Sequence, residues 1–152
     1  MTVETTACDC EGRKALTWEE IRTHIRKRYK PITETPTSLS LECQFPNGGR
    51  QTVRVTFHGE RIGGPALEVD GPVGDTHSLA PADALAYNHK APTGSLALAG
   101  KVVVLRHMLS LKDATIDAID QALTYVAGEA ARLRRTSTRP PVPPELFAYL
   151  AS

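Results

Sequence analysis

The chain has 152 residues, 41% hydrophobic and 23% charged, which is typical of one globular domain. Its 18 Lys and Arg residues nearly balance its 17 Asp and Glu residues, so the net charge of +1 indicates neither a nucleic-acid-binding nor a membrane-binding protein. No apolar run approaches the roughly 20 residues that span a bilayer, and no signal-peptide pattern opens the sequence. We therefore expect a cytoplasmic protein that binds neither nucleic acid nor a membrane.

The composition divides the chain into three parts. Residues 1–15 are polar and without a period, and we expect a flexible tail there. Residues 16–135 carry the periodic patterns of a single domain. Residues 136–152 hold four prolines, which favour an extended spacer, and then a short apolar tip. This tip is either a short helix docked on the domain or an anchor for another protein, and its apolar residues are Leu146, Phe147, Tyr149 and Leu150.

The first helix is marked at both ends. Thr17 and Glu20 form the capping-box pattern that begins a helix. Ile21 and Ile25 then recur on one face, and Pro31 stops the helix. The basic residues near its end favour a solvated helix terminus over a phosphate-binding site.

Two alternating segments follow the first helix. Residues 38–45 and 50–59 each place an apolar side chain at every second position, the period of a half-buried strand. The PNGG sequence at 46–49 supplies a turn that requires a positive φ. The pattern predicts a β-hairpin with Cys43 on its apolar side, as a small core residue.

A third strand and a short helix are predicted next. The strand contains Leu67 and Val69 and is closed by a Gly-Pro pair. The helix has Pro81 in its first turn and Leu85 facing inward, and Pro92 ends it.

Two further strands meet at a tight turn at Ala99-Gly100. Pairing across this turn makes both faces of the hairpin apolar. An antiparallel hairpin of this kind needs a second layer on each face, and another copy of the protein is one candidate for such a layer. One face carries Leu96, Leu98, Val103 and Leu105, and the other carries Ala97, Val102 and Val104.

A long amphipathic helix after Asp113 completes the domain. The predicted fold is α+β, an antiparallel five-stranded sheet with helices on one face, in the order α-β-β-β-α-β-β-α. The apolar stripe of the last helix consists of Ile116, Ile119, Leu123, Val126, Ala130 and Leu133.

Motifs that carry chemistry are scarce. The sequence contains no phosphate-binding glycine loop, no nucleophile elbow and no zinc-protease helix. Its five histidines are scattered singly, and its three cysteines do not form a zinc-knuckle pattern. We predict a non-enzymatic protein without cofactor or metal. The alternative is a metal-binding protein or enzyme that uses Cys8, Cys10 and a distant histidine.

The second half of the domain resembles a known family. The resemblance rests on a strand ending near DGPVG, a helix ending in Asn88, the strands GSLAL and VVVLRHMLSL, and the closing amphipathic helix. Together these resemble the type III secretion chaperone-like fold, including the YbjN-like bacterial family, over about residues 16–135. The resemblance implies a small bacterial homodimer that binds an extended polypeptide or partner domain without a cofactor. It implies no catalytic residues, and the near-neutral charge favours the YbjN-like members over the acidic secretion chaperones.

The sequence thus predicts a non-catalytic, homodimeric protein-binding module. We expect Val102, Val104 and Met108 to form the dimer or partner face, with Leu39 and Leu41 at a sheet edge. An alternative is an accessory subunit tethered to a larger assembly through its C-terminal tail.

Overall fold

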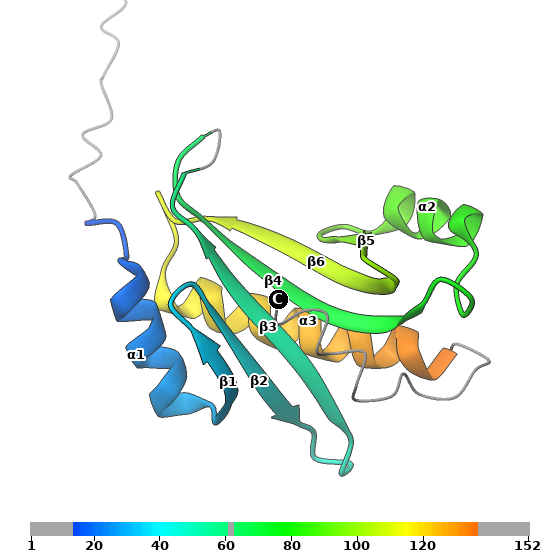
Figure 1. Ribbon diagram of the computed structural model, residues 1–152, viewed down its shortest axis with the longest axis horizontal. Helices are drawn as coiled ribbons and strands as arrows, with labels where there is room; N and C mark the ends of the chain where they lie inside the picture. The colour runs from blue at the N-terminus through cyan, green and yellow to red at the C-terminus, as the bar shows by residue number, and fades with distance from the viewer. Residues whose placement is uncertain (1–13, 61–62, 137–152) are drawn as a thin grey trace, which may run out of the picture.

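The structure, a computed structural model, describes residues 14–60 and 63–136. It is an α+β fold in which three helices accompany one open, antiparallel sheet of six strands (Figure 1). The elements in chain order are α1 (Trp18–Arg28), β1 (Pro31–Thr35), β2 (Ser38–Gln44), β3 (Arg50–His58), β4 (Ala66–Asp75), α2 (Pro81–Lys90), β5 (Ser95–Ala99), β6 (Val102–Ser110) and α3 (Ile116–Thr136).

The prediction of five strands was wrong by one. The additional strand, β1, pairs antiparallel with β2 and consists of the sequence PITET, whose side chains are mostly exposed. A strand with little apolar content and a proline at its start is tolerated at a sheet edge, where half of its backbone groups face water. Strand β1 is therefore recognised by its backbone pairing with β2, because its sequence has no alternation of apolar residues that would predict a strand.

The strand order is β1-β2-β3-β4-β6-β5, so β1 and β5 are the edges. The prediction that Leu39 and Leu41 lie at a sheet edge was wrong. Both belong to β2, which is paired on both sides, and both are fully buried in the core.

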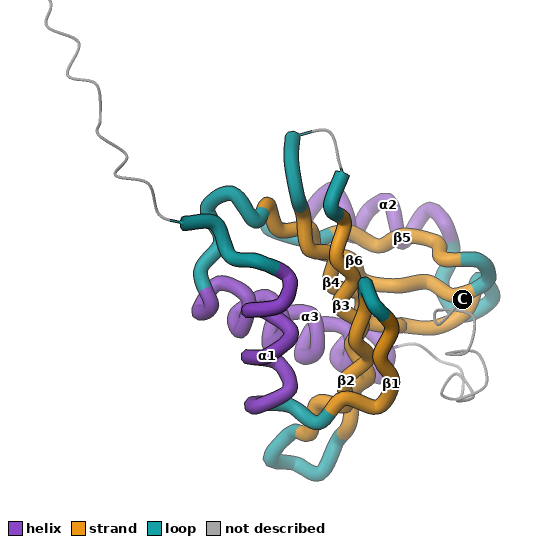
Figure 2. Tube along the Cα trace, turned by 60° about the vertical axis from the view of Figure 1, so that its left-hand side comes forward, coloured by secondary structure: helices purple, strands orange, loops and turns teal. Residues whose placement is uncertain are grey.

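The main core lies between the sheet and helices α1 and α3, on what we call the inner face of the sheet. Figure 2 shows these two helices together on one side of β2 and β3. Helix α3 presents the stripe predicted from its sequence, and α1 contributes Trp18, which stacks on Phe57 of β3 with ring centroids 5.6 Å apart. The central core residues are Ile21, Ile25, Leu39, Leu41, Val53, Val55, Leu67, Val69, Ile119, Leu123 and Val126.

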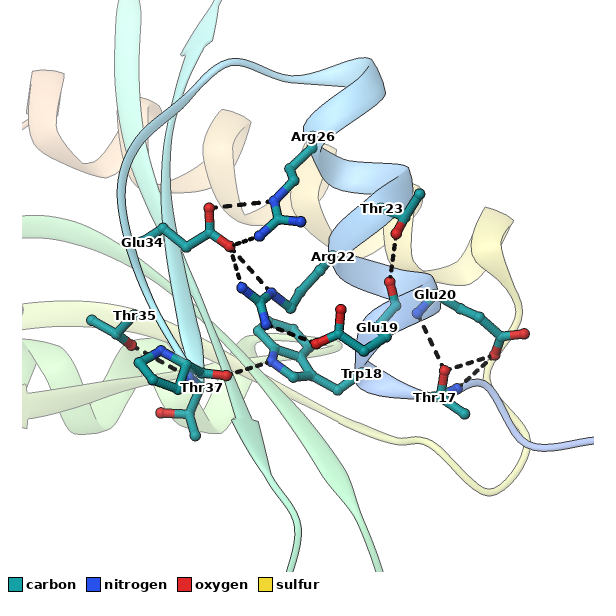
Figure 3. Close-up of polar contacts among 11 residues, drawn as sticks. Thr17, Trp18, Glu19, Glu20, Arg22, Thr23, Arg26, Glu34, Thr35 and Thr37 are labelled. Atoms are coloured by element: carbon teal, nitrogen blue, oxygen red, sulfur yellow. Dashed lines mark hydrogen bonds and ion pairs between the residues drawn. The ribbon is translucent and has the colours of Figure 1, made fainter.

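Helix α1 is fixed at its start and along one side (Figure 3). The Thr17 hydroxyl accepts from the Glu20 N–H, and the Glu20 carboxylate accepts from the Thr17 N–H, which confirms the predicted capping box. Arg22 and Arg26 both reach the carboxylate of Glu34 on β1. These ion pairs tie the helix to the edge strand that the sequence pattern did not reveal.

Strand β4 is longer than predicted, because the chain runs through Gly71 and Pro72 to Asp75. The register with β6 shifts between Pro72 and Gly74, and a proline is accommodated at such an irregularity. Gly71 lies directly against α3: a Cβ there would be 2.8 Å from the Cβ of Ala130. The prediction that the strand ends at Gly71 was wrong. The glycine does not close the strand there; its lack of a side chain allows α3 to pack closely against β4.

Both predicted hairpins are present, but the turn of the second lies at Gly100-Lys101, one residue later than the predicted Ala99-Gly100. Gly48 has a φ of 83° in the turn between β2 and β3. In the second hairpin Leu96 pairs with Leu105 and Ala97 with Val104, which shifts the pairing by two residues but leaves each side chain on its predicted face. None of the helices in the described ranges is long and apolar enough to cross a membrane. The predictions for Cys8, Cys10 and both tails concern residues 1–13 and 137–152, which lie outside the described residues.

Candidate protein-binding site

An apolar groove separates helix α2 from the edge strand β5. Its volume is about 310 Å³. Carbon atoms make up most of its walls, and Asn88 and Thr76 contribute the polar groups. A groove with apolar walls and a few polar groups is the usual form of a binding site. The apolar lining includes Leu79, Pro81, Ala84, Leu85, Leu96 and Leu98.

Two leucines of this groove are exposed to an unusual degree. Leu85 of α2 is 71% exposed and Leu98 of β5 is 61% exposed, and Ile32 is the other large apolar residue that is similarly exposed within the described ranges. The prediction that Leu85 faces inward was wrong: Ala84 and Tyr87 pack against the core instead. Leu98 shares the inner face with Leu96, but it lies near the hairpin end, where α2 leaves it uncovered.

The edge of β5 is partly closed by a side chain. The Asn88 amide nitrogen donates to the Leu96 carbonyl (3.1 Å), and the Leu96 N–H donates to the Asn88 amide oxygen (2.6 Å). Asn88 thus occupies the position of a neighbouring strand. Because outward-facing backbone groups recur at every second residue, the N–H and C=O of Leu98 point to the same edge. Asn88 therefore leaves the edge of β5 open beside the exposed Leu98.

The opposite face of the β5–β6 hairpin, which we call the outer face, carries Val102 and Val104. They are 1% and 0% exposed, and Ala97 and Ala99 pack against them. Alternation along β6 places Met108 on this same face, where it is half-buried and pairs with Glu68. The three predicted residues of β6 therefore share the outer face, with Arg106 between Val104 and Met108, while Leu39 and Leu41 lie on the inner face.

Charged residues continue the outer face across β3, β4 and β6. Arg106 donates to both carboxylate oxygens of Asp70, at 2.9 and 3.0 Å, and it also pairs with Glu68 at 3.2 Å. The Glu68 carboxylate in turn contacts His58. Burial raises the pKa of Asp70, which is 3% exposed; the Arg106 hydrogen bonds oppose this shift, and the nearby Glu68 carboxylate adds to it.

A second hollow, of about 500 Å³, lies between α2 and α3. Three of its polar side chains bind one another: Tyr87 donates to Glu129 at 2.9 Å, and Arg132 donates to the other Glu129 oxygen at 2.9 Å. The hydrogen bonds from Arg132, followed by that from Tyr87, lower the pKa of Glu129. The bond between Tyr87 and Glu129 holds α2 against α3.

Residues that could carry chemistry remain separate in the described part of the chain. No group of three or more His, Cys, Asp or Glu side chains there is placed to hold a metal ion. His24 contacts Asp120 at 2.9 Å and His58 contacts Glu68 at 3.1 Å, at separate places in the fold. Cys43 packs against the core, and burial raises the pKa of its thiol, which makes it a weaker nucleophile at neutral pH.

No protein-family model matches this chain, and no curated protein matches its sequence. The candidate site therefore rests on its geometry. Sequence reasoning placed Leu98 on the correct face but did not single it out, and it missed Leu85. One sequence feature could have indicated that Leu85 is exposed. The predicted helix is short and rich in alanine, so it has few large side chains that could cover a leucine.

Proposed function

We propose that this chain is a non-catalytic, cytoplasmic protein-binding module, and that the groove between α2 and β5 receives an apolar segment of a partner protein. The observation that carries this proposal is the placement of Leu85 and Leu98 on the same groove, next to an edge strand. Isolated exposed leucines are common on protein surfaces, but two that line one apolar groove are typical of an interaction site. The resemblance to secretion chaperone-like and YbjN-like bacterial proteins supports the same proposal.

The size of the groove indicates a short segment. Asn88 already pairs with Leu96, so backbone pairing by a partner is restricted to the region of Leu98. Selectivity then depends on apolar side chains that enter the groove. A partner with one or two large apolar residues, in a segment that leaves the Asn88 pairing intact, fits this site.

Affinity at a single groove is expected to be weak. Burial of each leucine contributes about 1.5–3 kcal/mol, and association costs at least about 4 kcal/mol in lost freedom. A homodimer, which the sequence predicts, presents two grooves and raises the apparent affinity for a partner with two such segments. Light scattering over a concentration series tests the dimer, which has twice the 16.5 kDa mass of the chain.

Selection of peptides tests the groove. A displayed library of 12-residue peptides is selected on the full-length protein and then measured against Leu98→Asp and Leu85→Asp. We expect selected peptides to be rich in Leu, Ile, Phe or Met and to lose at least tenfold in affinity for both variants. Ile32→Asp is the matched control, because Ile32 is a comparably exposed residue on the other edge strand.

Two results would contradict the groove proposal. One is a set of peptides that bind the wild type and both leucine variants equally. The other is a set whose binding depends on Ile32. Circular dichroism of each variant confirms that the fold is retained, as expected for substitutions at exposed side chains.

A further inference from the structure

The outer face of β5–β6 requires a cover that the described elements do not provide. Val104 is fully buried, yet its apolar neighbours on this face are Ala97, Ala99 and its cross-strand partner Pro72, which lie beside the valine in the sheet and do not form a layer over it. Helices α1 and α3 lie on the inner face, and α2 is bound to α3 through Tyr87 and Glu129. Within the described ranges, therefore, no helix covers Val102 and Val104.

Three segments of the chain lie outside the described residues and are candidates for this cover: 1–13, 61–62 and 137–152. Two of them adjoin the wrong end of the sheet. Residues 61–62 adjoin the start of β4, where Ala66 pairs with Ser110, about 20 Å along β6 from Val104. Residues 1–13 precede α1, whose Trp18 stacks on Phe57 at that same distant end. They also contain few large apolar side chains, Met1 and Val3.

Helix α3, in contrast, ends on the inner face at the same end of the sheet as Val102. Ala130 and Leu133 pack in the cluster of Val73 and Val103, at the end of the sheet where β6 begins. Arg134 donates to the Arg50 carbonyl at the start of β3, at 2.7 Å. The chain therefore leaves α3 at the end of the sheet to which Val102 belongs, one layer below it.

We propose that the C-terminal segment 137–152 crosses this end of the sheet and covers Val102 and Val104 with its apolar tip. Nine residues, 137–145, separate α3 from the tip, and four of them are prolines. At about 3.1 Å per residue in an extended proline-rich conformation, they span about 28 Å. The path from a helix below a sheet to the opposite face needs about 20 Å, given layers about 10 Å apart.

The tip has the composition that the face requires. Its four large apolar side chains, Leu146, Phe147, Tyr149 and Leu150, recur at the i, i+1, i+3 and i+4 positions that form one face of a helical turn. In this proposal the tip of the same chain provides the second layer that the outer face of the β5–β6 hairpin needs. This site is distinct from the groove of the proposed function, so each proposal can fail without the other.

Photo-crosslinking in the full-length protein tests this docking. Phe147 is replaced by the photoreactive benzoylphenylalanine, and the irradiated protein is separated by mass and mapped by peptide analysis. We expect crosslinks within a single chain, on residues 97–104. A covalent dimer linked to these residues would assign the face to a second copy and overturn the proposal. Crosslinks elsewhere, or none, would overturn it as well.

A stability measurement gives an independent readout. We expect Phe147→Asp to lower the melting temperature by about 2–6 °C, because the docked tip contributes burial that the substitution removes. Ser137→Asp, which adds the same charge to the spacer, is the matched control and should leave the melting temperature within about 1 °C. Equal melting temperatures for the two variants would contradict docking of the tip and leave the anchor role for this segment.

Discussion

The side-chain amide of Asn88 binds both backbone groups of Leu96, one as donor and one as acceptor, and so acts as the next strand at the edge of the sheet. Edge strands expose unpaired backbone groups that attract other chains. Here a residue of α2 satisfies one such pair and also fixes the helix beside β5. The same contact forms one wall of the apolar groove and limits how far a partner strand could extend along it.

We expect Asn88→Ala to destabilise the protein by about 1–2 kcal/mol, because two hydrogen bonds are lost while the groove admits water to the freed groups. Thermal denaturation measures this loss, and hydrogen exchange of the Leu96 amide should accelerate. Asn88→Asp is the matched variant: it retains the acceptor for the Leu96 N–H and should preserve more of the amide protection. Unchanged exchange at Leu96 in the alanine variant would contradict this role of Asn88.

Gly71→Ala should destabilise the protein by about 1–3 kcal/mol through overpacking. The new Cβ would lie 2.8 Å from the Ala130 Cβ and 3.0 Å from Val126 Cγ1, so α3 must move away from β4. Gly128→Ala, on α3 itself, meets nothing within 4 Å and should stabilise the protein by about 0.5–1 kcal/mol. Chemical denaturation of both variants checks the opposite signs, and a neutral Gly71→Ala would contradict the close packing.

Glu129→Gln should weaken the protein in a pH-dependent manner. The pKa of Glu129 is lowered by Arg132 and Tyr87, so its carboxylate stabilises the fold at pH values above its ordinary pKa near 4.5. That contribution is lost as the pH falls through the lower, folded-state value. We expect a stability difference from wild type of about 0.5–1 kcal/mol at pH 7, since Arg132 is half-exposed.

Denaturant titrations at several pH values measure this effect. The difference between wild type and Glu129→Gln should shrink steadily below about pH 4.5. Glu60→Gln, at an exposed position, removes the same formal charge as a control. A difference for Glu129→Gln that stays constant down to pH 3 would show that its ionised carboxylate is not the stabilising group.

Arg106→Met should be among the more damaging substitutions on the outer face, with an expected loss of about 2–4 kcal/mol. It leaves the carboxylate of Asp70 buried without the guanidinium that binds both of its oxygens. The double variant Asp70→Leu/Arg106→Met removes both charges and should recover part of that stability. A double variant less stable than Arg106→Met alone would show that the ion pair is not the source of the loss.

Local patterns were sufficient wherever neighbouring residues in the chain interact with each other. The capping box at Thr17, the turn at Gly48, the shared face of Leu96 and Leu105 and the apolar stripe of α3 all follow from the order of residues close together in the chain. For this reason the α+β class and the two-faced β5–β6 hairpin could be predicted from the sequence.

Tertiary structure decided the features that depend on partners distant in the chain. Strand β1 exists because β2 offers it an edge, and β4 continues through Gly71 because α3 approaches there. Leu39 and Leu41 are core residues because β2 is paired on both sides and covered by helices. Leu85 is exposed because Ala84 and Tyr87 fill the contact with the core. A period of apolar residues defines which side chains share a face, but only the packing of other elements determines which face is covered.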